Sequence, residues 1–153
     1  MSKLIIMVGL PASGKSTYTS KYENQNRLSI VSTDDIRREL YGNPETQGNG
    51  QEVFNLAYQR IEMCLRAGDT VVFDATNLKA RNRKYLCRRF RPIADIIIAV
   101  YMAVSVDECI ARDERRSRTV GAEVIKRLAA SMTIPRLDEG FDLIEICGKM
   151  RES

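Results

Sequence analysis

The sequence predicts an α/β domain built on a five-stranded, mainly parallel sheet with helices on both faces. Apolar runs typical of buried strands recur along the chain, at residues 3–9, 28–32, 70–74, 95–102 and 143–147. Helical patterns separate these runs, and such alternation is typical of βαβ units with parallel strands. A chain of 153 residues suits one core, and no linker or repeat divides it. We therefore expect residues 1–153 to form a single domain.

The helix before the third strand has the clearest pattern of the expected helices. Its apolar residues recur at helical spacing, at Val53, Ala57, Ile61 and Cys64. Gly68 follows where a C-terminal cap belongs. A later helix with apolar positions from Val124 to Met132 ends before Pro135. Residues 41–50 are polar and rich in turn formers, so we expect a loop there.

The segment directly after the first strand carries the most informative motif. Gly9-Leu10-Pro11-Ala12-Ser13-Gly14-Lys15-Ser16 fits the pattern Gly-x4-Gly-Lys-Ser/Thr, and a helical pattern continues from Thr17. The glycines allow successive backbone N–H groups to surround a phosphate. Lys15 is expected to reach the β- and γ-phosphates, and the Ser16 hydroxyl to bind Mg²⁺.

This motif predicts the three-layer fold of the P-loop NTPases and binding of ATP or GTP with Mg²⁺. The residues expected to hold the nucleotide are Gly9, Pro11, Ala12, Ser13, Gly14, Lys15, Ser16 and Thr17. A glycine-rich turn between strand and helix is the alternative interpretation. No residue identifies the base of the donor nucleotide.

Acidic residues follow the second strand. Phosphoryl transfer needs a group that orients the acceptor hydroxyl and accepts its proton, and Asp34 is our first candidate for this general base. Asp35 is the second candidate and an expected acceptor contact. Arg37, one turn further, is expected to bind an acceptor phosphate. Alternatively, Thr33 or Asp34 caps the following helix and Arg37 is only solvent-exposed.

The third strand ends in Asp74-Ala75-Thr76-Asn77. An apolar strand that ends in Asp is the Walker B arrangement, so Asp74 is expected to hold Mg²⁺ directly or through water. Thr76 and Asn77 are expected to bind the acceptor, and ordinary turn chemistry is the alternative for both.

An arginine-rich stretch precedes the last long helix and predicts a lid at about residues 112–121. Guanidinium groups suit the charge that develops on a transferred phosphoryl group. We favour Arg112 and Arg116 for this role, with Arg115 as a further nucleotide contact. Whether Arg115, Arg116 or Arg118 is the second lid arginine stays open, and a solvated charged loop is the alternative.

Charge is unevenly distributed in this mildly basic chain, which has a net charge of +4 and a pI of about 9.0. Residues 79–91 contain seven basic side chains and no acidic one. Such a run is either a solvated helix face or a site for an anionic partner. Because it directly follows Asn77, we expect a nucleic-acid strand to lie along it and to contact Arg81 and Arg88.

Other features exclude several classes of protein. The chain has no His, which excludes His-based acid–base catalysis, and its four Cys residues form no Cys-x-x-Cys pair. A zinc site is therefore not expected, and thiols of this kind are typical of a reducing cytoplasm. No apolar run approaches the length of a membrane span, and we expect no signal peptide.

Taken in order, these motifs resemble those of the phage-type polynucleotide 5′-hydroxyl kinases. The order is Gly-x4-Gly-Lys-Ser-Thr, Asp-Asp-x-Arg, Asp-x-Thr-Asn-Leu and an arginine-rich lid, over residues 1–135. The resemblance implies a general base at Asp34, a phosphate contact at Arg37 and an acceptor site at Thr76-Asn77. It also implies that the lid arginines contact the nucleotide phosphates. Because no Asp-x-Asp-Gly-Thr motif occurs, an enzyme without the 3′-phosphatase domain is implied.

The resulting hypothesis is an Mg²⁺-dependent kinase that acts on 5′-hydroxyl ends of RNA or DNA. The first alternative is a kinase of a nucleoside, sugar or antibiotic, or a zeta-toxin-like kinase, since these share the same core motifs. A non-catalytic nucleotide-binding module is the third. The sequence does not specify RNA or DNA, the oligomeric state or the biological pathway.

Overall fold

A parallel sheet forms the centre of the computed structural model, which describes residues 1–20, 22–44, 50–116 and 120–148. Its strands are β1 (Lys3–Val8), β2 (Leu28–Ser32), β3 (Thr70–Asp74), β4 (Ile96–Met102) and β5 (Leu143–Cys147). They lie in the order β2-β3-β1-β4-β5, and every neighbouring pair is parallel. The predicted five-stranded sheet is confirmed.

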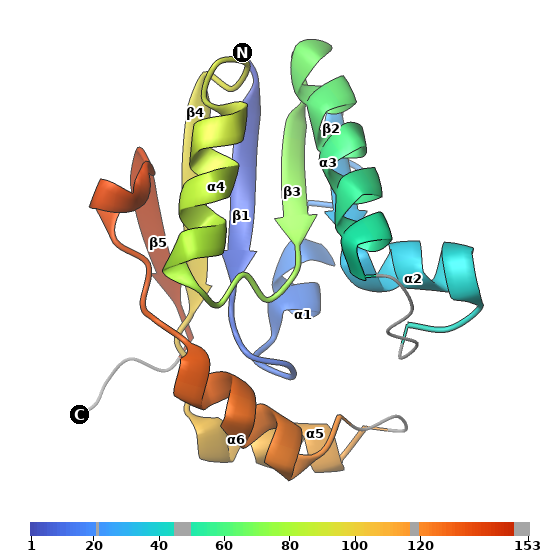
Figure 1. Cartoon of the computed structure of the whole chain (residues 1–153), viewed down its shortest axis with the longest axis vertical. Coiled ribbons are helices and arrows are strands. Elements are labelled where there is room, and N and C mark those ends of the chain that lie inside the picture. Colours follow the sequence, from blue (N-terminus) through green and yellow to red (C-terminus); the bar gives the residue numbers. More distant parts are fainter. Residues whose placement is uncertain (21, 45–49, 117–119, 149–153) are drawn as a thin grey trace.

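The helices form a layer on each side of the sheet and a group at one end. They are α1 (Lys15–Ser20), α2 (Thr33–Tyr41), α3 (Gly50–Arg66), α4 (Ala80–Phe90), α5 (Val106–Glu114), α6 (Ala122–Ser131) and the 3₁₀ helix η1 (Leu137–Glu139). Helices α3 and α4 cover one face of the sheet, and the short α1 lies on the other (Figure 1). Helices α5 and α6 lie beyond the carboxyl ends of the strands (Figure 1).

The central strand β1 is buried on both faces, which explains its unbroken apolar sequence. Leu4 and Ile6 pack toward α3 and α4, whereas Ile5 and Met7 pack toward the side of α1. Helix α3 buries the predicted apolar stripe, but its last buried residue is Leu65 rather than Cys64. Buried residues at this spacing attach the helix along its full length to the sheet.

Helix α3 ends as the sequence predicts. Gly68 has a φ of 84°, and its N–H donates to the Leu65 carbonyl at 2.9 Å. Glycine occupies this left-handed conformation without the clash that a Cβ would cause. None of the helices in the described ranges is long and apolar enough to cross a membrane.

The strand order places a crevice at the carboxyl ends of β1 and β3. The chain leaves β1 toward β2, on one side of the sheet, and leaves β3 toward β4, on the opposite side. Connections that diverge in this way open a crevice in which α/β proteins bind ligands. The phosphate loop follows β1 and Asp74 ends β3, so the two motifs meet there.

Candidate active site

The loop after β1 has the shape of a phosphate cradle. Ala12 and Gly14 have φ values of 65° and 97°, so the loop turns through left-handed conformations. A Cβ on Gly9 would lie 2.6 Å from Ser13 Oγ and 3.0 Å from Met102 Cβ. The loop therefore closes tightly around itself, and only glycine fits at position 9. Leu10 anchors it in an apolar cluster with Cys109 and Ile125 of α5 and α6.

Lys15 begins α1 and bends back over the loop. Its Nζ donates to the carbonyl oxygens of Gly9 at 3.0 Å and Leu10 at 2.8 Å. Burial lowers the pKa of Lys15 from 10.5 to about 8, although the nearby Asp74 and Asp34 favour its charged form. The predicted lysine and both predicted carboxylates therefore lie within one electrostatic environment.

Asp74 lies at the carboxyl end of β3, half-buried. Burial raises the pKa of its carboxyl group, Lys15 lowers it, and the negative charges of Asp34 and Asp35 raise it further. In the register of the sheet Asp74 stands opposite Ser32, at the end of β2. Ser16, on the first turn of α1, is exposed, as is Thr17. A half-buried carboxylate at the end of β3 and an exposed hydroxyl directly after the phosphate loop are both oxygen groups suited to Mg²⁺.

Helix α2 presents Asp34 to solvent. Ser32 is its N-cap, since Ser32 Oγ accepts from the Asp35 N–H at 3.2 Å. The alternative that Thr33 or Asp34 caps this helix is wrong, because the preceding serine already does so. Asp34 keeps 56 % of its side chain exposed, and its Oδ1 lies 3.5 Å from Arg37 Nη1. Asp35 instead pairs with Arg38 at 2.7 Å.

Arg37 is largely buried, which disagrees with the alternative that it is only a solvent-exposed residue. Its side chain is 16 % exposed, and its Nε is buried without a hydrogen-bond partner among the described residues. A buried guanidinium nitrogen of this kind favours an anionic ligand beside Asp34.

The loop after β3 is tied to the phosphate loop. The Thr76 carbonyl accepts from the Gly9 N–H at 3.0 Å, and Asn77 Nδ2 donates to the Met7 carbonyl at 2.7 Å. Asn77 is buried and has a φ of 48°. The Asn77 side chain thus stabilises this turn, and Asn77 and the half-buried Thr76 both line a cavity beside α3.

The predicted lid arginines differ in their surroundings. Arg112 lies within α5, where its Nε donates to Glu108 at 3.0 Å. Its Nη1 lies 3.5 Å from the position that a Cβ on Gly14 would take, so it flanks the phosphate loop. Arg116 pairs with Asp113 at 3.0 Å, and its charge contributes to the lowered pKa of Lys15. Arg115 is 67 % exposed, and Arg118 lies outside the described residues.

Asp113 is a functional candidate that the sequence analysis did not single out. Its buried carboxylate accepts from the N–H groups of Val120 and Gly121 at 2.9 Å, directly before α6. Although burial raises its pKa, these amides and Arg116 together hold the pKa of Asp113 below its ordinary value. Asp113 therefore joins the end of α5 to the start of α6. Asp113 lies beside Glu114 in the sequence, and no local signal distinguished the buried carboxylate from its neighbour.

Not all basic residues of the run 79–91 are accessible to a partner, because some are buried or paired with acidic residues. Arg83 is fully buried and pairs with Glu139 through Nε at 2.7 Å. Arg83, Leu86 and Phe90 share helical spacing, and this pattern could have identified the buried face. Arg91 pairs with Asp142. Arg88 is exposed, but it lies about 10 Å along α4 from Arg81.

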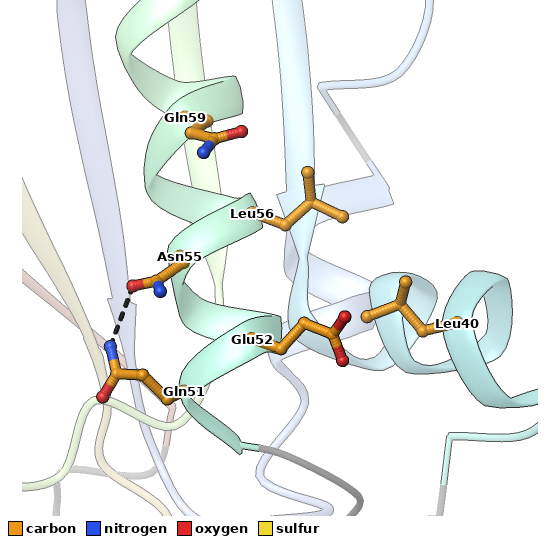
Figure 2. Close-up of a pocket in the computed structure, with 6 residues that line it drawn as sticks. All are labelled: Leu40, Gln51, Glu52, Asn55, Leu56 and Gln59. Carbon is orange, nitrogen blue, oxygen red and sulfur yellow. Dashed lines mark hydrogen bonds between the residues drawn. The ribbon is translucent and has the colours of Figure 1, made fainter.

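Two cavities of about 420 Å³ each lie beside α3. One lies between α2 and α3, lined by Leu40, Gln51, Glu52, Asn55, Leu56 and Gln59 (Figure 2). None of these is a predicted site residue. The other contains Thr76, Asn77 and Arg81 together with Phe54 and Tyr58 of α3, and we call it the acceptor-side cavity.

The parallel sheet, the phosphate cradle and the carboxylates at the strand ends define a P-loop kinase fold. Residues 4–135 match the AAA_33 family model, an AAA domain, and the chain belongs to this family of P-loop kinases. Membership implies ATP with Mg²⁺ as the phosphoryl donor. The P-loop kinase class predicted from the sequence is confirmed.

Two relatives have sequences that are 25% identical to this chain over 94% of its length. They are the transcription factor bHLH140 of Arabidopsis thaliana and the L-seryl-tRNA(Sec) kinase of Methanococcus maripaludis. The chain spans 16% of the length of the former and 57% of the latter.

Solved structures show the same fold at lower identity. A chain of the Pnkp1/Rnl/Hen1 RNA repair complex superposes with a TM-score of 0.69 at 22% identity, over 85% of this chain and 43% of that one. A gluconokinase from Sinorhizobium meliloti gives a TM-score of 0.65 at 17% identity, over 98% of this chain and 84% of the other. Proteins with this fold thus include a gluconokinase and a component of an RNA repair complex.

Proposed function

We propose that the protein transfers the γ-phosphate of ATP or GTP to the 5′-hydroxyl end of RNA or DNA, with Mg²⁺. The observation that carries this proposal is that three features lie at the carboxyl ends of the neighbouring strands β1, β3 and β2. These are the phosphate loop with Lys15, the exposed Asp34, and the acceptor-side cavity with Arg81.

The residues of the loop fit a nucleoside triphosphate. Gly14 has a left-handed backbone conformation, which lets the loop turn around a phosphate. The buried Ser13 Oγ has no hydrogen-bond partner among the described residues and is available to a phosphate. Lys15 and Arg112 supply positive charge on two sides of this loop. Ser16 and Asp74 would hold Mg²⁺, which neutralises charge on the phosphates when bound.

Each residue then has a defined part in the transfer. Asp34 accepts the proton of the acceptor's 5′-hydroxyl group. The oxygen of that hydroxyl bonds to the γ-phosphorus, and the bond between the γ-phosphorus and the nucleoside diphosphate breaks. Lys15, Arg112 and Arg116 stabilise the charge on the transferred group. Arg37, beside Asp34, binds the phosphate next to the acceptor.

A polynucleotide acceptor is favoured by the charge beside Thr76. Lys79 and Arg81 are exposed on the wall of the acceptor-side cavity, and none of its described lining residues is acidic. Positive charge at this position suits the phosphates of a nucleic acid. The RNA repair complex and the seryl-tRNA kinase add support, because their names connect related proteins with RNA.

A small-molecule kinase, or a zeta-toxin-like one, is the second candidate. The observation in its favour is the size of the acceptor-side cavity, about 420 Å³, which suits a ligand as small as a sugar. The likeness of this fold to a gluconokinase agrees with that alternative. A non-catalytic module is disfavoured, because Lys15 and Arg112 flank the phosphate loop and the charge of Asp34 acts on Lys15.

The experiment is transfer of labelled γ-phosphate from ATP to a 5′-hydroxyl oligonucleotide, with and without Mg²⁺. A 5′-phosphorylated oligonucleotide, a free nucleoside and gluconate serve as controls. Labelling that is confined to the 5′-hydroxyl oligonucleotide supports the proposal. Labelling of gluconate or the nucleoside alone would instead establish a small-molecule kinase.

A further inference from the structure

Hydrogen bonds join one wall of the acceptor-side cavity to the end of β1 and the start of the phosphate loop. That wall includes Thr76 and Asn77, and these residues bond to the Gly9 N–H and the Met7 carbonyl at 3.0 Å and 2.7 Å. The opposite wall comes from α3, and α6 contributes Leu128 and Ser131. A molecule in this cavity would therefore contact the same loop that organises the start of the phosphate cradle.

Aromatic side chains form the α3 wall. Phe54 and Tyr58 are half-buried and one helical turn apart, and their ring centroids are 6.0 Å apart. Phe54 packs edge-to-face on Phe73 with centroids 6.4 Å apart. Neighbours on several sides hold Tyr58 in place: Tyr85, Phe90 and the Arg89 guanidinium. Both rings are thus fixed by packing before any ligand binds.

The other lining residues divide into an apolar part and a polar part. Leu78, Leu86 and Leu128 extend the apolar wall. The polar part consists of the α4 N-cap Lys79, of Arg81 and Asn82 in the first turn of α4, and of Gln51, Thr76, Asn77 and Ser131. A sugar could bond to this polar part, but it would leave much of the apolar wall without a matching surface. A flat aromatic ring attached to a phosphate matches both parts.

We propose that the acceptor-side cavity binds the 5′-terminal nucleobase of the acceptor, stacked on Phe54 and Tyr58, with Lys79 and Arg81 near the phosphates that follow the one bound by Arg37. This inference rests on the proposed function and makes it more specific. It predicts that a base at the acceptor end lowers the KM of the acceptor. Which of the bases is present should matter little, because every base has a face that can stack.

The test compares two acceptors on the wild-type protein, both with a 5′-hydroxyl. One oligonucleotide carries a base on its terminal nucleotide, and the other is abasic at that nucleotide alone. We expect a KM at least about ten-fold higher for the abasic acceptor, since stacking of one base on an aromatic side chain has that order of effect. Equal KM values for the two acceptors would overturn the inference and leave the proposed function intact.

Variants of Phe54 assign the effect to this cavity. Phe54→Leu is expected to raise the KM of the base-containing acceptor about ten-fold, to that of the abasic acceptor, without changing the KM of ATP. Phe54→Trp restores a stacking surface and is expected to keep the base preference even if Phe54→Leu is poorly folded. Gln59→Ala, an exposed change on the same helix, is the control and should have no effect.

The outcomes separate this inference from the proposed function. A base preference that persists in Phe54→Leu would place the base elsewhere and overturn the inference alone. If neither oligonucleotide is labelled while a small acceptor is, the proposed function fails and the inference falls with it.

Discussion

At the scale of single residues, Asp34 and Asp35 are neighbours with different environments. Asp35 pairs with Arg38, whereas Asp34 lies near Lys15 and Arg37. We therefore expect Asp34→Asn to lower kcat by roughly 10²- to 10⁴-fold, the usual range for losing a general base. Phosphate transfer measured at saturating ATP and acceptor tests this.

Asp35→Asn is the matched control for that experiment. It removes the same charge one residue away, so it should change kcat little. The Kd for ATP should stay nearly constant in both variants, because the base acts on the acceptor. A larger loss of kcat in Asp35→Asn than in Asp34→Asn would transfer the catalytic role to Asp35.

The buried position of Lys15 lowers the stability of the fold while it places a positive charge at the phosphate loop. Burial lowers its pKa to about 8 from 10.5, so the unfolded chain binds more protons than the folded one between these pH values. The cost of the charged lysine to folding is therefore greatest below pH 8 and fades as the pH rises toward 10.5. Lys15→Met removes this cost together with the catalytic charge.

We expect Lys15→Met to abolish phosphate transfer. Its free energy of unfolding, relative to that of the wild type, should be highest below pH 8 and should decline toward pH 10.5. Urea unfolding across this pH range measures the difference. A difference that does not vary with pH would show that Lys15 has an ordinary pKa in the folded protein.

At the scale of elements, the buried pair Arg83–Glu139 connects α4, the loop after β3 and η1. Arg83 Nη1 also donates to the carbonyls of Asn77 and Leu78 at 3.0 Å and 2.8 Å. One side chain thus positions the loop that bears Thr76. The arrangement explains why an arginine occupies the buried face of α4.

Removing one partner of this pair should be costly. We expect Arg83→Met to reduce the free energy of unfolding by about 3–5 kcal/mol, because Glu139 would be left buried and unpaired. The double variant Arg83→Met/Glu139→Leu should recover part of that loss. Urea denaturation of both variants provides the measurement.

Arg91→Met serves for comparison, since Arg91 and Asp142 form a pair that is about half exposed. This change should cost less than about 1 kcal/mol. If both variants lose the same free energy of unfolding, the buried pair contributes no more to stability than the half-exposed one.

At the scale of the whole molecule, the accessible basic residues of α4 suggest the path of a bound oligonucleotide along this helix. Arg81 lines the acceptor-side cavity, and Arg88 lies about two helical turns further along the same helix. Arg81 should therefore contact phosphates at the acceptor end, and Arg88 only those of longer strands.

Charge reversal tests this arrangement. Arg81→Glu should raise the KM of every oligonucleotide, and Arg88→Glu only that of longer ones, while the Kd for ATP stays unchanged. Because phosphate contacts release counterions, the KM of the wild type should rise with salt, and more steeply than in Arg81→Glu. An oligonucleotide KM unaffected by either substitution would count against binding along α4.

Much of the fold could be predicted from local patterns. The strands of the sheet and the end of α3 at Gly68 follow from periodicity and from the conformational freedom of glycine. The loop 9–16 could be identified because its chemistry is carried by contiguous residues. Asp34 and Asp74 could be placed near it, since parallel strands bring their carboxyl ends together.

The sequence by itself thus determined the class of this protein and the position of its phosphate site, because both are encoded in short segments. Tertiary structure alone decided which partners the charged side chains find. It buried Arg83 against Glu139, 56 residues away, and placed Arg112 against Gly14. It also joined Phe54 of α3 to Thr76 and Leu128 in one cavity. Such partnerships depend on distances between remote segments, and no local pattern encodes them.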